Sequence, residues 1–245
     1  PNLEYLDVSG TRIAQDEENI LFRGNIRNLT YLAMNDISTV DRGLIMTLFR
    51  HLTRLESLEM NQLVTYTTIS PDKDVTYFSN LKRLSCCDTL ITTPFLESVW
   101  KNCKHLQHLD IRGCKHIATE NLCETFARHP RDILTFKAGW GLCNSSVNSI
   151  KSSLLNLEIL HLTVGSTVSP DLEFLQSTKL KEFSLTCCPI SPRAIDRIIA
   201  TNTGLEKIQL EMLCSCDSIY STCLQNIKNC KNLMKLSLKG NAQHS

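Results

Sequence analysis

The sequence lacks the features by which membrane proteins and several enzyme classes are recognised. No run of apolar residues approaches the roughly 20 that a helix needs to cross a bilayer, and no basic stretch followed by an apolar one opens the chain. Glycine is scarce, with 9 residues in 245, and no Gly-rich phosphate loop, dinucleotide turn or Gly-x-Ser-x-Gly motif occurs. We therefore expect no membrane segment, no cofactor and no serine-hydrolase chemistry.

An excess of charge of one sign is also missing. The 26 Lys and Arg residues and the 25 Asp and Glu residues leave a formal net charge of +1, and both signs are spread along the whole chain. Such a balance produces no long-range field that attracts nucleic acid or an anionic membrane. It predicts neither a nucleic-acid partner nor a membrane partner, and it does not identify any other.

Cysteine is abundant, with 12 residues, but the chain is long and rich enough in aliphatic residues to fold without disulfides. We expect reduced thiols and a protein of the cytoplasm or the nucleus. Two glycosylation sequons, which begin at Asn28 and Asn144, leave secretion as the alternative. No second Cys or His cluster has the spacing of a zinc site, so no metal is expected.

An apolar-x-x-apolar-x-apolar pattern organises the chain, as in LQHLDI at residues 106–111. It recurs 10 times at intervals of 23 to 28 residues. The average interval lies inside the range of about 20 to 29 residues that is typical of leucine-rich repeats. The first apolar position is occupied by Leu3, Leu29, Leu55, Leu81, Leu106, Ile133, Leu157, Leu180, Leu205 and Leu233.

Between copies of this pattern the apolar spacing lengthens toward that of a helix, as at Ile195 and Ile199. Each repeat is therefore predicted as a strand followed by a helix. Pro94 lies near the start of one such helix, with Thr93 as its candidate cap. Stacked repeats predict an α/β leucine-rich-repeat solenoid, a horseshoe of about ten strand-helix repeats with one curved parallel sheet on its concave face.

Residues 1–245 are predicted to form a single leucine-rich-repeat domain. Because repeat residues occur almost as soon as the sequence starts at Pro1 and a repeat strand ends close to Ser245, we expect a segment of a longer chain with an adaptor-binding or capping module upstream. Two irregular stretches are expected within it. A loop is predicted around residues 72–74 and a distorted turn around residues 138–141.

Cysteines bracket the fifth strand, since Cys103 precedes it and Cys114 follows it. The tenth repeat places Cys230 and Asn241 at the same two positions, and the eighth has Cys188 after its strand. A small side chain with weak hydrogen-bonding ability fits there against backbone groups of the next repeat. This pattern resembles the cysteine-containing repeats of F-box substrate receptors, which belong to cullin-RING ubiquitin ligases.

The resemblance implies recognition of a protein substrate for ubiquitin-dependent degradation. It also implies that a Skp-type adaptor and a cullin are reached only through an F-box module outside these residues. The alternative is a leucine-rich-repeat scaffold or enzyme regulator, of the inhibitor or GTPase-activating type, that is not linked to ubiquitin. We expect no catalytic activity, because no nucleophile and base are placed together. His105 and His108, for example, should point to opposite faces of a strand.

The candidate binding surface is the open face of the sheet, because side chains alternate across a strand and the residues between the core positions project outward. Aromatic, histidine and arginine side chains on such a face are typical of interfaces. Tyr5 and Tyr31 are predicted to form an aromatic platform on neighbouring strands, beside a mixed-charge centre around Asp110. The predicted partner-binding residues are Tyr5, Asp7, Tyr31, Glu59, Arg83, His108, Asp110, Arg112, Lys137, His161, Glu182, Lys207, Gln209 and Lys235.

Overall fold

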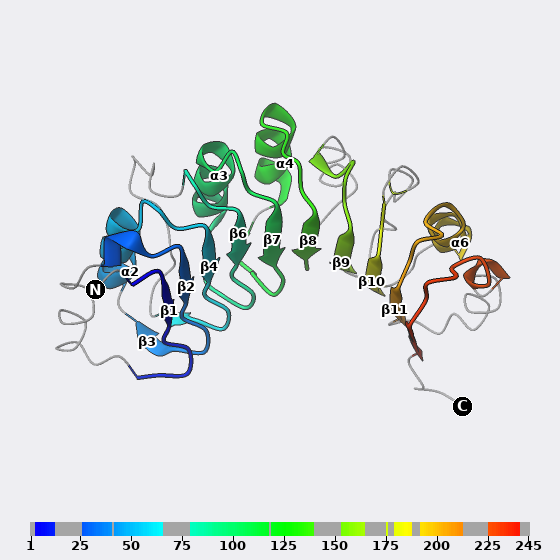
Figure 1. Ribbon diagram of the computed structural model, residues 1–245, viewed down its shortest axis with the longest axis horizontal. Coiled ribbons are helices and arrows are strands. Elements are labelled where there is room, and N and C mark those ends of the chain that lie inside the picture. The colour runs from blue at the N-terminus through cyan, green and yellow to red at the C-terminus, as the bar shows by residue number, and fades with distance from the viewer. Residues whose placement is uncertain are drawn as a thin grey trace.

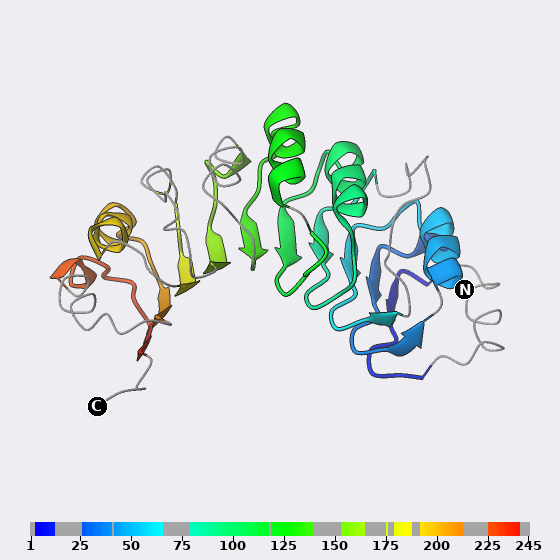
Figure 2. The same ribbon diagram turned by 180° about the vertical axis from the view of Figure 1, so that it is seen from behind.

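The chain forms an open, curved solenoid with its strands along the inner side and its helices along the outer side (Figure 1). This computed structural model describes residues 3–12, 26–40, 42–65, 79–117, 119–139, 153–164, 175, 179–187, 192–212 and 225–240. Seen from behind, the helices again follow the outer edge of the arc (Figure 2). The predicted leucine-rich-repeat architecture is confirmed.

The inner side is one 10-stranded parallel sheet in which each strand pairs with the strand of the next repeat. Its strands, in spatial and chain order, are β1 (Tyr5–Asp7), β2 (Tyr31–Ala33), β4 (Ser57–Glu59), β6 (Arg83–Ser85), β7 (His108–Ile111), β8 (Thr135–Ala138), β9 (Ile159–Val164), β10 (Glu182–Cys187), β11 (Lys207–Met212) and β12 (Lys235–Gly240). The second apolar position of the repeat is in register across them, as for Leu84 with Leu109 and Leu109 with Phe136. The repeat spacing therefore sets the strand register.

The outer layer contains α2 (Arg42–His51), α3 (Thr93–Asn102), α4 (Thr119–Arg128), α6 (Pro192–Thr201) and the 3-10 helix η1 (Ile26–Asn28). Their apolar faces pack toward the sheet, and the ring centroids of Trp100 and Phe126 lie 4.0 Å apart between α3 and α4. Thr92 is the N-cap of α3, without a side-chain capping bond, whereas the predicted cap, Thr93, is the first helical residue and is buried. None of the helices described is long and apolar enough to span a membrane.

A second, two-stranded parallel sheet pairs β3 (Ser38–Val40) with β5 (Val64–Thr65). Figure 1 places β3 below the N-terminal strands of the main sheet. The sequence did not predict this sheet, because its strands are only 3 and 2 residues long and lie outside the repeating leucine positions.

A recurring turn follows the N-terminal strands. Its second residue has a left-handed backbone, and its N–H donates to a carbonyl oxygen of the next repeat, as from Asp36 to Asn61 at 2.9 Å and from Asp88 to Arg112 at 2.7 Å. This turn residue therefore ties each repeat to the next. The positions with positive φ are Gly10, Asp36, Gln62, Asp88 and Gly113, with values of 53° to 71°.

Cysteines occupy the two predicted positions around β7. Cys103 is the buried C-cap of α3, and Cys114 is buried in the turn after the strand. The Cys114 thiol donates to the carbonyl oxygen of Cys86 at 2.9 Å, an oxygen that also accepts from the Thr89 hydroxyl at 2.6 Å. The Cys114 side chain thus contacts a backbone group of a neighbouring repeat, but this is the preceding repeat, whereas the sequence suggested the next one.

Cys86, Cys87, Cys103, Cys114 and Cys230 are free thiols. Burial raises the pKa of Cys103 to about 12, so this thiol is protonated at neutral pH. Cys188 and Asn241, the predicted loop at residues 72–74 and Trp140 in the predicted distorted turn lie outside the described residues.

Candidate functional site

Two rows of side chains run along the inner face of the main sheet, and we call this surface the concave face. One row passes through successive register partners Tyr5, Tyr31, Ser57, Arg83, His108, Thr135, Ile159, Glu182, Lys207 and Lys235. The other contains Asp7, Ala33, Glu59, Ser85, Asp110, Lys137, His161, Ser184, Gln209 and Ser237. Every predicted binding residue except Arg112, which follows β7, lies in these rows. Their binding role stays a prediction.

The N-terminal end of the concave face carries the predicted aromatic platform. The rings of Tyr5 and Tyr31 stack with centroids 4.3 Å apart and planes 2° apart, and Tyr5 remains 58% exposed. Burial and the neighbouring Glu59 carboxylate raise the pKa of Tyr31 above its ordinary value. Hydrogen bonding from the hydroxyl and from the backbone N–H of Ser9 lowers the pKa of Asp7. This end of the surface is therefore aromatic and acidic.

Next to this platform, two asparagines hold neighbouring repeats together. The backbone N–H of Asn61 donates to Oδ1 of Asn35 at 2.8 Å, and the backbone N–H of Cys87 donates to Oδ1 of Asn61 at the same distance. The Ser85 hydroxyl also donates to Oδ1 of Asn61, at 2.7 Å. Because these amide oxygens already accept hydrogen bonds, we assign both asparagines to repeat stacking.

At the centre of the face, Asp110 and Arg112 form a two-pronged ion pair. The Arg112 guanidinium donates to both carboxylate oxygens of Asp110, at 2.9 and 2.7 Å, and Asp110 is only 9% exposed. The hydrogen bonds that Arg112 donates to Asp110 raise the pKa of Arg112. Within the predicted mixed-charge centre, the charges of Asp110 and Arg112 therefore neutralise each other.

Two histidines flank the central strand β8. His108 Nδ1 lies 3.0 Å from the Thr135 hydroxyl, and His161 Nε2 lies 3.3 Å from a Glu182 carboxylate oxygen. Burial lowers the pKa of both histidines, and the positive charge of Lys137 lowers both further. At neutral pH each imidazole is therefore uncharged and acts as a hydrogen-bonding group.

The C-terminal part of the face is polar. Lys207 donates to Glu182 at 3.1 Å, and this bond together with that from His161 lowers the pKa of Glu182, although burial opposes the change. A shallow hollow of about 160 Å³ lies between β10, β11 and β12. Its polar lining consists of Ser184, Thr186, Gln209, Glu211, Ser237 and Lys239.

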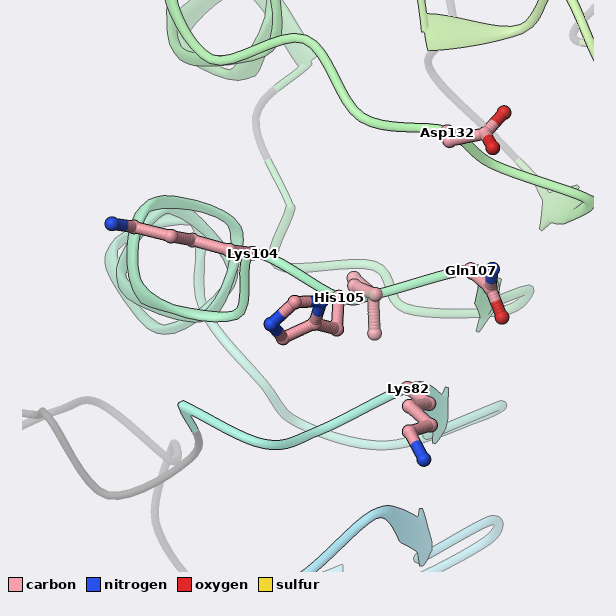
Figure 3. Close-up of a pocket in the computed structure, with 6 residues that line it drawn as sticks. Lys82, Lys104, His105, Gln107 and Asp132 are labelled. Carbon is pink, nitrogen blue, oxygen red and sulfur yellow. The ribbon is translucent and has the colours of Figure 1, made fainter.

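A second hollow, of about 290 Å³, lies off the concave face, among the segments that precede β6, β7 and β8. Figure 3 shows that Lys104 points away from Gln107 and that Asp132 comes from a separate segment, so the side chains do not converge. Lys82 already donates to Glu56 at 2.8 Å. This hollow has no arrangement of groups that suggests catalysis.

His105 lines this second hollow and lies before β7, whereas His108 is on the concave face. The two histidines thus lie on separate surfaces. The sequence suggested opposite faces of one strand, but only His108 belongs to the strand. Within the described ranges, no group of three or more His, Cys, Asp or Glu residues is placed to hold a metal ion.

The sequence matches no protein-family model and no curated protein. Among solved structures, TLR13 in a complex named TLR13-ssRNA13 matches with a TM-score of 0.50 and 17% identity, over 98% of this chain and 40% of its own. An internalin (inlF) from Listeria monocytogenes str. 4b F2365 matches with a TM-score of 0.45 and 14% identity, over 99% of this chain and 62% of its own. This chain thus spans less than two thirds of either one. The likeness to the first, together with the ten-stranded parallel sheet, shows that the chain is an α/β leucine-rich-repeat solenoid.

Proposed function

We propose that this chain is a protein-binding module that recognises its partner on the concave face. The observation that carries the proposal is the continuity of that face, because 10 strands present two aligned rows of side chains while the described helices all lie on the other side (Figure 2). Nine strand spacings of about 4.8 Å give a surface about 43 Å long. A surface of this length is ample for a specific protein interface of about 800 Å² per partner.

The residues on this face also suit a protein partner. Tyrosine and arginine contribute strongly to interfaces because they combine a large contact area with hydrogen bonding. Tyr5 is largely exposed, and Arg83 is exposed on β6. Preformed strands hold both side chains, so little backbone ordering opposes binding.

We further propose that the partner is a substrate of a cullin-RING ubiquitin ligase and that this chain is the substrate-recognition domain of an SCF-type receptor in the cytoplasm or nucleus. The support is the resemblance of the Cys103 and Cys114 pattern, together with the contact of the Cys114 thiol with the preceding repeat. A Skp-type adaptor and a cullin would join through a module outside these residues. The alternative is a scaffold or enzyme regulator that uses the same face.

The binding proposal is tested by quantitative affinity purification of the full-length protein from cells. One variant carries Tyr5→Ser, Gln209→Arg and Lys235→Glu on the concave face, and the control carries Lys101→Glu and Arg193→Ser on α3 and α6. We expect the concave variant to lose at least about tenfold in recovery of specific partners, whereas the control keeps them. Equal recovery by both variants, at equal melting temperatures, would reject the concave face as the binding surface.

The ligase proposal has a separate test. Full-length protein is immunoprecipitated and probed for a Skp-type adaptor and a cullin, and the abundance of its partners is followed after the protein is depleted. We expect co-recovery of both ligase subunits and accumulation of at least one partner. Partners that bind the concave face without adaptor or cullin would instead favour the scaffold or regulator.

A further inference from the structure

The near-zero net charge of the chain conceals an uneven charge distribution on the concave face. In its two rows, the strands β1, β2 and β4 carry carboxylates, Asp7 and Glu59, but no Lys or Arg. From β6 onward the same rows contain four basic residues and two acidic ones. The basic residues are Arg83, Lys137, Lys207 and Lys235, and the acidic residues are Asp110 and Glu182.

Both of those carboxylates are already engaged. Asp110 is held by Arg112, and Glu182 accepts from Lys207. Among the described residues, the side chains of Arg83, Lys137 and Lys235 make no hydrogen bond or ion pair. The central and C-terminal part of the concave face therefore has three positive charges that the face itself does not neutralise.

Lys137 occupies the middle of this region. Its register partners are Asp110 on β7 and His161 on β9, and it is only partly exposed. A partly buried ammonium group without a counter-ion is unfavourable, and an incoming anion would relieve that cost. The imidazoles of His108 and His161, uncharged at neutral pH, add polar groups that can hydrogen-bond to the same anion.

We propose that the concave face between β6 and β9 binds the carboxylates of an extended, acidic segment of a protein partner, with Lys137 and Arg83 as the anchoring cations. This inference rests on the proposed protein-binding function and adds the chemistry of the partner. Arg83 and Lys137 are two strand spacings apart and offset by two residues along the strand, about 12 Å in all, a span that an extended polypeptide covers in about three to four residues. The recognised segment would thus carry acidic residues about three to four positions apart.

A polypeptide fits this charge pattern better than a nucleic acid does. Nucleic acid has a negative charge at every nucleotide and would pass Asp7 and Glu59 beside the tyrosines as well as the basic centre. Those carboxylates repel a continuous polyanion. A polypeptide can place its carboxylates over Arg83 and Lys137 and an apolar side chain over the ring of Tyr5.

Fluorescence anisotropy with the full-length protein tests this proposal. The probes are labelled peptides of alternating Glu and Ser, Gln and Ser, or Lys and Ser, and a single-stranded oligouridine of matched length. We expect binding of the Glu peptide that weakens as salt increases, and no comparable binding of the Gln or Lys peptide. Equal binding of the Gln peptide, or tighter binding of the RNA than of the Glu peptide, would overturn the proposal.

Charge-reversal variants locate the site. Lys137→Glu should weaken binding of the Glu peptide at least about tenfold, Lys137→Arg should retain most of it, and Lys101→Glu on α3 serves as the matched control. Unchanged binding by Lys137→Glu, with an unchanged melting temperature, would refute an anchoring role for Lys137. If that happens while the Tyr5, Gln209 and Lys235 variant still loses its cellular partners, the acidic-segment proposal fails and the protein-binding proposal stands.

Discussion

Individual polar residues on the concave face fall into two groups that have different consequences when they are replaced. Asn35, Asn61 and Asp110 are bound to neighbouring protein groups. Tyr5 and Lys137 present polar or aromatic surface to solvent. Strand alternation predicted that Tyr5, Asp110 and Lys137 lie on the concave face, but not which of them are engaged. That distinction depends on contacts with the next repeat for the two asparagines and with Arg112 for Asp110, so it requires the structure.

The pKa of His161 depends on the positive charge of Lys137. We expect its pKa to lie below the ordinary value of a histidine, because burial and Lys137 both disfavour the imidazolium. Lys137→Met should raise this pKa, since a neighbouring positive charge is removed, and Glu182→Gln should lower it further, since a stabilising negative charge is lost. NMR titration of the histidine ring protons measures both changes. An identical pKa in wild type and Lys137→Met would contradict this placement of charges.

Removal of Arg112 should lower the stability of the folded protein and not only its affinity for a partner. Asp110 is 9% exposed, and without Arg112 its carboxylate would lose both guanidinium hydrogen bonds. We expect Arg112→Ala to lower the free energy of unfolding by about 1–3 kcal/mol. Urea denaturation measures the loss, and Asp110→Asn in the same chain should restore part of it. No recovery in the double variant would argue against a penalty from the stranded carboxylate.

Among the structural elements, the strands follow the leucine pattern closely, because one repeating set of apolar positions defines both the core and the register. The turns after the strands were less predictable. Gly10 and Gly113 are expected where φ is positive, but Gln62 adopts φ of 53° and is not a residue that favours this region. Its N–H donates to the carbonyl oxygen of Cys87 at 2.7 Å, so contact with the next repeat fixes the conformation.

Gly113 is the turn residue most sensitive to substitution. It has φ of 71°, and a Cβ there would lie 1.8 Å from Oδ1 of Asp88, whereas a Cβ at Gly10, with φ of 69°, would meet nothing within 4 Å. We expect Gly113→Ala to lower the free energy of unfolding by about 2–4 kcal/mol and Gly10→Ala by about 1 kcal/mol. Chemical denaturation distinguishes them. If both variants lose the same stability, the close approach of Asp88 is not the cause.

Over the whole molecule, the solenoid was predictable because stacked repeats contact mainly their neighbours, so a period read from the sequence determines the architecture. For the binding surface, the sequence predicted which face of the sheet is the candidate, but not how charge is distributed on it. The net charge of +1 suggested no electrostatic preference for a partner, because it averages an acidic N-terminal end with a basic centre. Only the side-chain contacts show that Asp110 and Glu182 each have a basic partner while Lys137 has no acidic one in the part of the chain that the structure describes.

Contacts between repeats should make the central repeats unfold cooperatively. The Trp100 indole donates to the carbonyl oxygen of His129 at 2.8 Å, and Arg131 donates back to the carbonyl oxygen of Trp100 at 2.7 Å. We expect Trp100→Ala to cost about 3–5 kcal/mol and to expose neighbouring repeats together. Hydrogen exchange measures this as increased exchange in β7 and β8 as well as α3. Increased exchange confined to α3 would contradict coupling between repeats.

The central claim is that the concave face binds a protein partner, and site-specific photo-crosslinking in cells tests it most directly. A benzophenone amino acid is placed at Tyr5 or Gln209 on the concave face, or at Lys101 on the outer helix α3, in the full-length protein. We predict crosslinks to the same protein partner from Tyr5 and Gln209 and none from Lys101. A partner that crosslinks from Lys101 and from neither concave position would contradict the claim.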